Sequence, residues 1–247
     1  MTPDVVVDVG NTRIKRGVRG PDGTLKLDYI DSEWFNVEGL PRSLGRAKLV
    51  VAGSHPERRA QFARWASGLH DVVEITSHEQ LPIDVDVDHP EKVGIDRLLG
   101  AVAANRLRTP GRAAMTVDVG TAATVNLVDA NGTFTGGLIL PGVRLMLLSL
   151  HENTSKLPLV ESGERRFADR TFPGRSTEDA IRAGVSYAIA GAVRLALEHA
   201  KVGEQYPELF LTGGGSPAIA DLLADHLPRQ VPTLVLDGLV IAAETLP

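Results

Sequence analysis

A short motif that occurs twice constrains the fold of this chain more than any other feature. One apolar run ends in Asp8-Val9-Gly10-Asn11-Thr12, and a second ends in Asp118-Val119-Gly120-Thr121-Ala122. Each run reads as a buried strand, and a carboxylate, a glycine and a hydroxyl follow it in the same order. One copy alone is ordinary turn chemistry, because Asp and Gly both favour loops. Two copies in the same local context indicate a duplicated architecture with an acid at each strand end.

The elements expected after each motif also repeat. After the first motif we expect a strand over residues 13–19, a turn at Pro21-Asp22-Gly23-Thr24 and a strand over residues 25–30. After the second motif we expect a strand through Val128, a hairpin turn at Ala130-Asn131-Gly132 and a strand over residues 133–140. Each half thus has the order strand, motif, strand, turn, strand.

The stretch Arg108-Thr109-Pro110-Gly111 is the best boundary between the halves, because proline and glycine interrupt regular structure. We therefore expect an N-terminal domain of residues 1–110 and a C-terminal domain of residues 111–247. A chain of 247 residues is long enough for two such domains, each with its own core.

The first half carries signals for a strand-to-helix crossover. Residues 48–53 read as a buried strand, and Pro56 marks the start of a helix that runs to about Gly68. Residues 72–76 read as another strand. The segment from Leu81 to Pro90 reads either as a surface loop or as an edge strand.

The second half continues with a helix expected over residues 143–151, which Pro141-Gly142 introduces with room for close approach of a chain segment or a ligand. The polar stretch from Asn153 to Phe172 reads as a loop or lid. Ser176 is a candidate cap for a long helix whose small side chains suit a packed helix pair or a dimer seam. Later, Thr212-Gly213-Gly214-Gly215 precedes a helix expected at Ser216, a pattern that suits a phosphate or a nucleotide sugar.

Charge and composition exclude several classes of function. The net charge of −5 and the scattered arginines give no basic surface for nucleic acid. The absence of cysteine excludes disulfides, thiolate metal sites and a cysteine nucleophile. The first apolar run is only Val5-Val6-Val7, and we expect neither a signal peptide nor a segment that approaches membrane-spanning length. We therefore expect a cytoplasmic protein with no membrane partner.

A third motif, Gly94-Ile95-Asp96-Arg97, lies between the two copies and leads into an Ala-rich helix. Asp96 is the best-placed candidate in the sequence for a base that activates an acceptor hydroxyl, with Arg97 beside it. The alternative is that Asp96 is only a helix cap or a first-turn carboxylate favourable to the helix dipole.

Together these motifs suit a site for nucleotide, divalent cation and phosphate. Phosphoryl transfer needs mainly positioning and neutralisation of charge. Backbone amides and hydroxyls can hold phosphates, while a carboxylate holds magnesium through water. The histidines stay surface or packing residues in this interpretation, because His55, His78, His89 and His151 are not at metal-ligand spacing.

The three motifs, in this order and spacing, resemble the signature motifs of type III pantothenate kinases. The similarity continues through Gly136-Gly137, Pro141-Gly142, Thr154-Ser155-Lys156-Leu157-Pro158, Gly174-Arg175-Ser176-Thr177 and Thr212-Gly213-Gly214. It covers nearly the whole chain, and the ordered set is far more specific than any one member.

This resemblance implies both a fold and an activity. The fold is α/β, with two duplicated ribonuclease H-like domains of the actin, hexokinase and Hsp70 type, in which helices flank mixed sheets. The activity is ATP-dependent phosphorylation of pantothenate at its primary hydroxyl to 4'-phosphopantothenate, the first step towards coenzyme A.

The resemblance also implies roles for individual residues. Asp96 would be the catalytic base, and Gly94, Ile95, Arg97 and Thr177 would bind pantothenate. Asp8 would serve Mg²⁺ through water, and Asp118 would lie near a monovalent cation, K⁺ or NH₄⁺. ATP and its phosphates would contact a larger set, which comprises Asp8, Gly10, Asn11, Thr12, Lys15, Gly120 and Thr121. Members of the family are homodimers, so Thr177 is expected to act across the interface.

One departure and two alternatives accompany this interpretation. Many family members carry a tyrosine three residues before the proline of the third motif, where this chain has Val87. The acceptor pocket is therefore expected to be lined differently. The alternatives are another small-molecule kinase of the same architecture, such as a sugar or acetate kinase, and a non-catalytic regulator like the Bvg accessory factor. The presence of Asp8, Asp96 and Asp118 argues against loss of activity.

Overall fold

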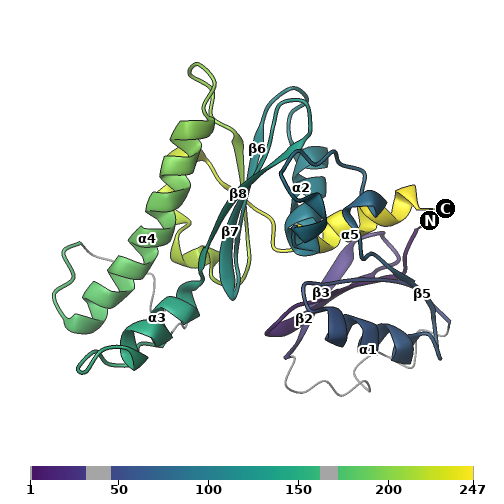
Figure 1. Ribbon diagram of the computed structural model, residues 1–247, viewed down its shortest axis with the longest axis horizontal. Coiled ribbons are helices and arrows are strands. Elements are labelled where there is room, and N and C mark those ends of the chain that lie inside the picture. Colours follow the sequence, from purple (N-terminus) through teal and green to yellow (C-terminus); the bar gives the residue numbers. More distant parts are fainter. Residues whose placement is uncertain (1, 32–45, 162–171, 247) are drawn as a thin grey trace. The chain divides into compact units, whose positions relative to one another are not determined.

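The computed structural model describes residues 2–31, 46–161 and 172–246. Within these ranges the chain forms two five-stranded mixed sheets with flanking helices (Figure 1). It divides into two compact units. Unit 1 comprises Met1–Leu107, Gly132–Phe134 and Thr233–Pro247, and unit 2 comprises Arg108–Asn131 and Thr135–Pro232.

The sheet of unit 1 has the strand order β3-β2-β1-β4-β5. β1 (Val5–Val9), β2 (Arg13–Arg19) and β3 (Leu25–Asp31) form an antiparallel meander, as the turn residues predicted. β4 (Lys48–Ala52) pairs in parallel with β1, and β5 (Asp71–Glu74) pairs in parallel with β4. The connection from β4 to β5 is helix α1 (Pro56–Ala66), which begins at the proline that the sequence singled out. Every residue of β1 is buried, which explains its continuous apolar run.

The sheet of unit 2 repeats this order as β10-β9-β6-β7-β8. β6 (Ala114–Val119) is antiparallel to β7 (Ala122–Val128) and parallel to β9 (Glu208–Thr212). The outer strands are β8 (Phe134–Pro141) and β10 (Arg229–Gln230). Each motif strand thus occupies the centre of its sheet, with an antiparallel meander on one side and parallel strands on the other. This topology confirms the expected duplicated ribonuclease H-like fold.

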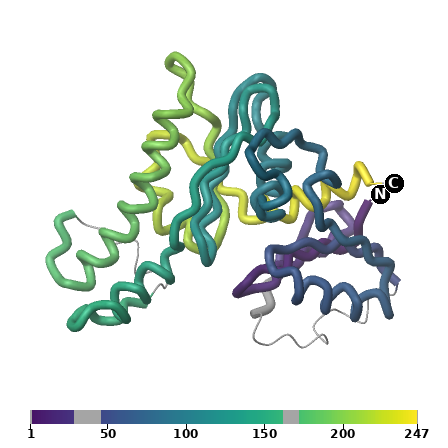
Figure 2. Tube along the Cα trace, viewed as in Figure 1, coloured from purple at the N-terminus to yellow at the C-terminus, as the bar shows by residue number. Residues whose placement is uncertain are grey.

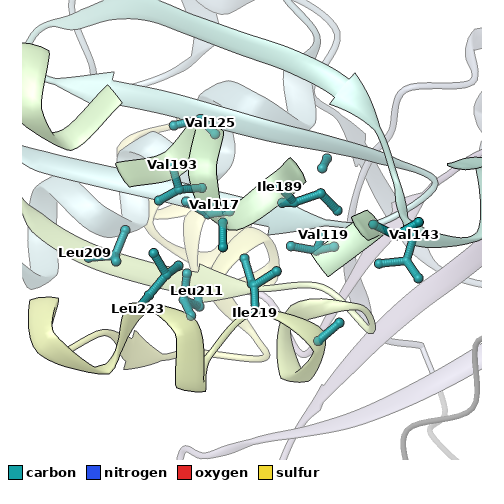
Figure 3. Packing of buried hydrophobic residues seen from close by; sticks show 14 of the residues in the cluster. Val117, Val119, Val125, Val143, Ile189, Val193, Leu209, Leu211, Ile219 and Leu223 are labelled. Atoms are coloured by element: carbon teal, nitrogen blue, oxygen red, sulfur yellow. The ribbon is translucent and has the colours of Figure 1, made fainter. Parts of the chain in front are cut away.

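The core of unit 2 lies between the β6, β7 and β9 strands and the long helix α4 (Thr177–Ala200). Figure 3 shows Val117 and Val119 of β6 close to Ile189 of α4 and Leu211 of β9. Ser176 caps α4, because its Oγ accepts the backbone N–H of Asp179, as expected. Helix α3 (Val143–Glu152) contributes Val143 and Leu147 to the same core.

Helix α5 (Leu234–Thr245) belongs to unit 1, although it follows unit 2 in the chain. It packs against helix α2 (Ile95–Leu107) and against β1 (Figure 2). At Gly238 the helices approach so closely that a Cβ atom would overlap the main chain of Leu99. The division at residue 110 placed this segment in the second domain. In the structure residues 233–247 belong to unit 1 instead, because α5 buries its apolar side chains against α2 and the first sheet.

The remaining elements are short 3₁₀ helices, and they decide one open alternative and correct one expectation. Of the two alternatives for residues 81–90, the structure shows the loop and not a regular edge strand: Val85 makes only an isolated bridge, and η4 (His78–Gln80) and η5 (Pro90–Lys92) lie at the two ends of the segment. The glycines at 213–215 do not precede an α-helix. They lead into η7 (Ser216–Ala218) and then η8 (Asp221–His226), which are too short to make a helix N-terminal phosphate site. The part of the expected loop or lid at 162–171 lies outside the described residues.

Helix α4 corrects another expectation. We expected no segment of membrane-spanning length, but α4 is long and apolar enough to cross a membrane by length and composition alone. Ile181, Val185 and Ile189 of α4 are buried in the core of unit 2. A helix that packs its apolar face into a protein core has the same length and composition.

Candidate active site

The first motif forms a buried carboxylate with a lysine beside it. Asp8 lies in β1 directly opposite Lys15 of β2, so both side chains point to the same face of the sheet. The Asp8 side chain is 5% exposed, and its Oδ2 lies 3.8 Å from Lys15 Nζ. This cluster therefore places one negative and one positive group at the strand end that the sequence assigned to metal and phosphate.

The loop after Asp8 turns tightly at Gly10. The Gly10 N–H donates to the Arg13 carbonyl oxygen at 3.1 Å, and a Cβ on Gly10 would lie 2.8 Å from that oxygen. Asn11 and Thr12 consequently lie exposed at the tip of the loop. Arg58, from the first turn of α1, donates through Nη1 to the Asn11 carbonyl oxygen at 2.7 Å. No local sequence pattern indicates this contact.

The third motif occupies the first turn of α2. Asp96 Oδ1 accepts the backbone N–H of Arg97 at 2.9 Å, so the carboxylate folds back on the helix start. This is the geometry of a first-turn acid, which the helix dipole favours. A Cβ on Gly94 would lie 2.7 Å from Asp96 Oδ1, which explains the glycine at that position. Asp96 as a whole is partly exposed.

Ile95 and Arg97 flank Asp96 in different environments. Ile95 is buried, and its side chain helps to anchor the helix start. The Arg97 guanidinium lies 5.6 Å from the centre of the Phe134 ring. Burial lowers the pKa of Arg97 and the Asp96 carboxylate raises it, but an arginine remains protonated at physiological pH. Arg97 thus supplies a fixed positive charge beside the candidate base.

The second motif brings Asp118 against the Gly-rich turn. In the sheet register Asp118 pairs with Thr124 of β7 and Thr212 of β9, so two hydroxyl groups flank it on the same face. Gly213 has a φ of +86°, and a Cβ there would overlap Asp118 Oδ1. The turn therefore depends on glycine both for its backbone conformation and for contact with the acid.

The loop of the second motif is held by the start of α3. The Gly120 N–H donates to the Ala122 carbonyl oxygen at 3.0 Å, and Thr121 is exposed. The Gly142 N–H donates to the Thr121 carbonyl oxygen at 3.0 Å, and a Cβ on Gly142 would overlap Gly120. The close approach expected at Pro141-Gly142 is therefore made by another chain segment.

Each candidate residue has its place in one of the two units. Asp8, Lys15 and the Asn11–Thr12 tip belong to unit 1, and Asp96 with Arg97 forms a second cluster in that unit. Asp118, Gly120 and Thr121 belong to unit 2. Thr177 is exposed at the first position of α4, also in unit 2.

The donor set suits one kind of metal ion. Among the described residues no group of three or more His, Cys, Asp or Glu side chains could hold a metal ion. A single buried carboxylate such as Asp8 fits Mg²⁺, which keeps several waters and takes further oxygens from substrate phosphates. It does not fit a structural Zn²⁺ cage, which needs four protein ligands.

Comparisons with known proteins agree with the resemblance seen in the sequence. A protein-family model described as "Type III pantothenate kinase" matches residues 5–199. A curated protein of that name from Paracidovorax citrulli is 36% identical over 97% of this chain and 98% of its own length. Another, from Azoarcus sp., is 36% identical over 97% of this chain and 90% of its own length.

Solved structures show similarity of fold. A Baf family protein from Campylobacter jejuni superposes with a TM-score of 0.66 at 18% identity and covers 97% of both chains. The ethanolamine utilization protein EutJ from Carboxydothermus hydrogenoformans gives a TM-score of 0.54 at 16% identity, over 96% of this chain and 89% of its own.

Proposed function

We propose roles for individual residues from the premise that this chain belongs to the type III pantothenate kinase family. Its activity is ATP-dependent phosphorylation of pantothenate, the first step of coenzyme A biosynthesis. Family membership favours this activity over the other small-molecule kinases and the non-catalytic regulator that the sequence left as alternatives. The observation that carries the site is the placement of Asp8 and Asp118 at equivalent central strands of two sheets, with Asp96 at a helix start.

Asp96 is the proposed catalytic base. Asp96 is partly exposed in the first turn of α2, and Gly94 leaves room for its carboxylate. The base takes the proton of the pantothenate primary hydroxyl as that oxygen attacks the γ-phosphorus of ATP, and ADP leaves with the electron pair of the broken P–O bond. Gly94, Ile95, Arg97 and Thr177 are the proposed pantothenate contacts, with Arg97 supplying positive charge.

The two motif loops are the proposed phosphate-binding elements. Gly10, Asn11 and Thr12 present a tight, exposed turn, and Lys15 adds positive charge beside it. Gly120 and Thr121 present the equivalent loop in the second unit. Asp8 would hold Mg²⁺ through water, and the cation would neutralise phosphate charge.

Asp118 is the proposed acid for a monovalent cation, K⁺ or NH₄⁺. Its support is the chemistry of its neighbours, because hydroxyl groups of Thr124 and Thr212 share its face of the sheet. Oxygen donors of this kind suit a hard cation.

A homodimer built on α4 is the proposed assembly. The face of α4 that points away from its own core carries small or apolar exposed residues at helical spacing, namely Ala180, Gly184, Tyr187, Ala188, Gly191 and Leu195. Among the described residues, and apart from adjacent residues and the backbone of α4 itself, no atom lies within 4 Å of a Cβ built on Gly184 or Gly191. Since small residues allow close helix approach, the proposed occupant of this face is α4 of a second copy. The proposed location is the cytoplasm.

The experiment that tests the proposed site chemistry is a coupled ADP-release assay with purified protein. With pantothenate, ATP and Mg²⁺ present, we expect turnover that depends on K⁺ or NH₄⁺. Na⁺ at equal ionic strength is the control. Turnover that is equal in Na⁺ and K⁺ would contradict the cation role of Asp118, while absence of ADP release that depends on pantothenate would contradict the proposed assignment of the site as a whole.

A further inference from the structure

Phe134 is the first residue of β8, but its backbone is hydrogen-bonded to the segment that precedes the Asp96 motif. Its N–H donates to the Asp84 carbonyl oxygen at 2.8 Å, and its carbonyl oxygen accepts the Asp86 N–H at 2.9 Å. These two bonds form the isolated parallel bridge between Phe134 and Val85. Phe134 accordingly clusters with unit 1. The backbone N–H and carbonyl groups of Phe134 are therefore both held by hydrogen bonds.

The Phe134 ring is fully buried, and the Arg97 guanidinium lies over it at 5.6 Å from its centre. A cation near the face of an aromatic ring is attracted by the negative charge of that face. Because the guanidinium is planar and its donors form a rigid fork, the orientation of the plane decides which acceptor atoms its N–H groups reach.

We propose that Phe134 is a positioning residue for the acceptor substrate, which acts by holding the Arg97 guanidinium in the orientation that binds pantothenate. This inference rests on the proposed role of Arg97. Two observations support it. The bridge to residues 84–86 fixes the ring relative to the chain that leads into the motif, and the ring in turn faces the guanidinium.

A packing role alone would have a different consequence. A fully buried phenylalanine contributes to stability wherever it lies, so its truncation would lower the melting temperature without a selective effect on one substrate. A positioning role raises the KM for pantothenate and leaves the KM for ATP unchanged.

The chain offers a matched control for this distinction. Phe210 of β9 is also fully buried, and the guanidinium of Arg229 lies 4.9 Å from the centre of its ring. Arg229 has no place in the proposed site. Phe210→Leu therefore removes the same kind of ring from the same kind of contact.

The experiment measures both KM values, kcat and the melting temperature for Phe134→Leu and Phe210→Leu, below the unfolding transition of each variant. We expect Phe134→Leu to raise the KM for pantothenate roughly threefold, the size of a partly desolvated cation–π contact, with the KM for ATP unchanged. Phe210→Leu should lower the melting temperature and leave both KM values unchanged. Phe134→Tyr, which keeps an aromatic face, should restore most of the pantothenate affinity.

Arg97→Ala and the double variant with Arg97→Ala and Phe134→Leu separate the role of Phe134 from the role of Arg97. If Phe134 acts through Arg97, Phe134→Leu should add no further rise in pantothenate KM to Arg97→Ala. An equal effect of Phe134→Leu in both backgrounds would overturn the inference while leaving the role of Arg97 intact. An unchanged pantothenate KM in Arg97→Ala would overturn the proposed role of Arg97 and this inference with it. If Phe134→Leu does not fold, Phe134→Met provides the same comparison with an unbranched side chain of similar size.

Discussion

At Gly94 and Gly213 a carboxylate oxygen lies where a side chain would begin. The Asp96 carboxylate fills that space beside Gly94, and the Asp118 carboxylate fills it beside Gly213. A side chain at either position would therefore displace the carboxylate. This explains in physical terms why a glycine accompanies each acid. Gly94 is two positions before Asp96 in the sequence, whereas Gly213 lies in the turn after β9 and Asp118 lies in β6.

The first prediction concerns Asp96 itself. Asp96→Asn keeps the shape of the side chain and an oxygen that can accept the Arg97 N–H, but it removes the base. We expect kcat to fall by about 10²- to 10⁴-fold, the usual contribution of general base catalysis, while the Kd for ATP stays within about twofold. Steady-state kinetics and nucleotide titration measure the two quantities. Asp129→Asn, in a surface turn, is the control and should keep full activity. An equal loss of ATP affinity would place Asp96 at the phosphates instead.

Local sequence patterns predicted some residue contacts and could not predict others. Asp8 and Lys15 face each other because the meander after the motif fixes their register, and that meander follows from turn residues. The contacts from Arg58 to Asn11 and from Arg97 to Phe134 join segments far apart in the chain. Nothing in the local pattern around Arg58 or Phe134 distinguishes them from other surface arginines or core phenylalanines.

At the scale of elements, strong periodicity and turn chemistry predicted most strands and helices. The strands of both meanders, α1 and α4 begin or end within a few residues of the expected positions. The glycines at 213–215 were expected to introduce a helix that binds phosphate. Two short 3₁₀ helices follow instead, and Gly213 leaves the space that the Asp118 carboxylate occupies. Glycines followed by Ser216-Pro217 are the same local pattern whether an α-helix or a short 3₁₀ helix comes next. Only the tertiary contact with Asp118 distinguishes the two outcomes.

The second prediction belongs to helix α4. Gly191→Glu places a charge on the exposed face of α4, where a Cβ meets no atom of the described residues apart from adjacent residues and the helix's own backbone. Because glutamate favours a helix over glycine by up to about 1 kcal/mol, the helix itself should not be weakened. We expect the variant to sediment as a monomer, while the unchanged chain and Gly191→Ala sediment as dimers. Analytical ultracentrifugation measures this difference. A Gly191→Glu variant that is still dimeric would rule out this face of α4 as the interface.

At the scale of the whole molecule, the chain returns to unit 1 after completing unit 2. Thr233–Pro247 clusters with unit 1, and α5 covers α2 and the first sheet. The sequence indicated two consecutive domains because the repeated motifs are consecutive. A local pattern can mark a C-terminal helix as apolar, but it contains no information on which of two sheets that helix will cover.

The third prediction follows from this return. Deletion of residues 233–247 removes α5, whose Leu234, Val235, Leu236 and Leu239 are all buried. Each such side chain contributes about 1.5–3 kcal/mol when buried, so their combined loss approaches the whole stability of a domain, about 5–15 kcal/mol. We expect unit 1 to lose its fold while the core of unit 2 persists. Hydrogen exchange should therefore show protection lost in β1, β4 and α2 and retained in β6 and β9.

Deletion of residues 246–247 alone is the matched control, because it leaves every buried residue of α5 in place. Its exchange pattern should equal that of the full chain. Addition of a peptide of residues 233–247 to the shorter chain should restore protection in β1, since the lost contacts are not covalent. Full protection of β1 without α5 would mean that the first sheet is stable without its cover, and the place of α5 in unit 1 would then be incidental to folding.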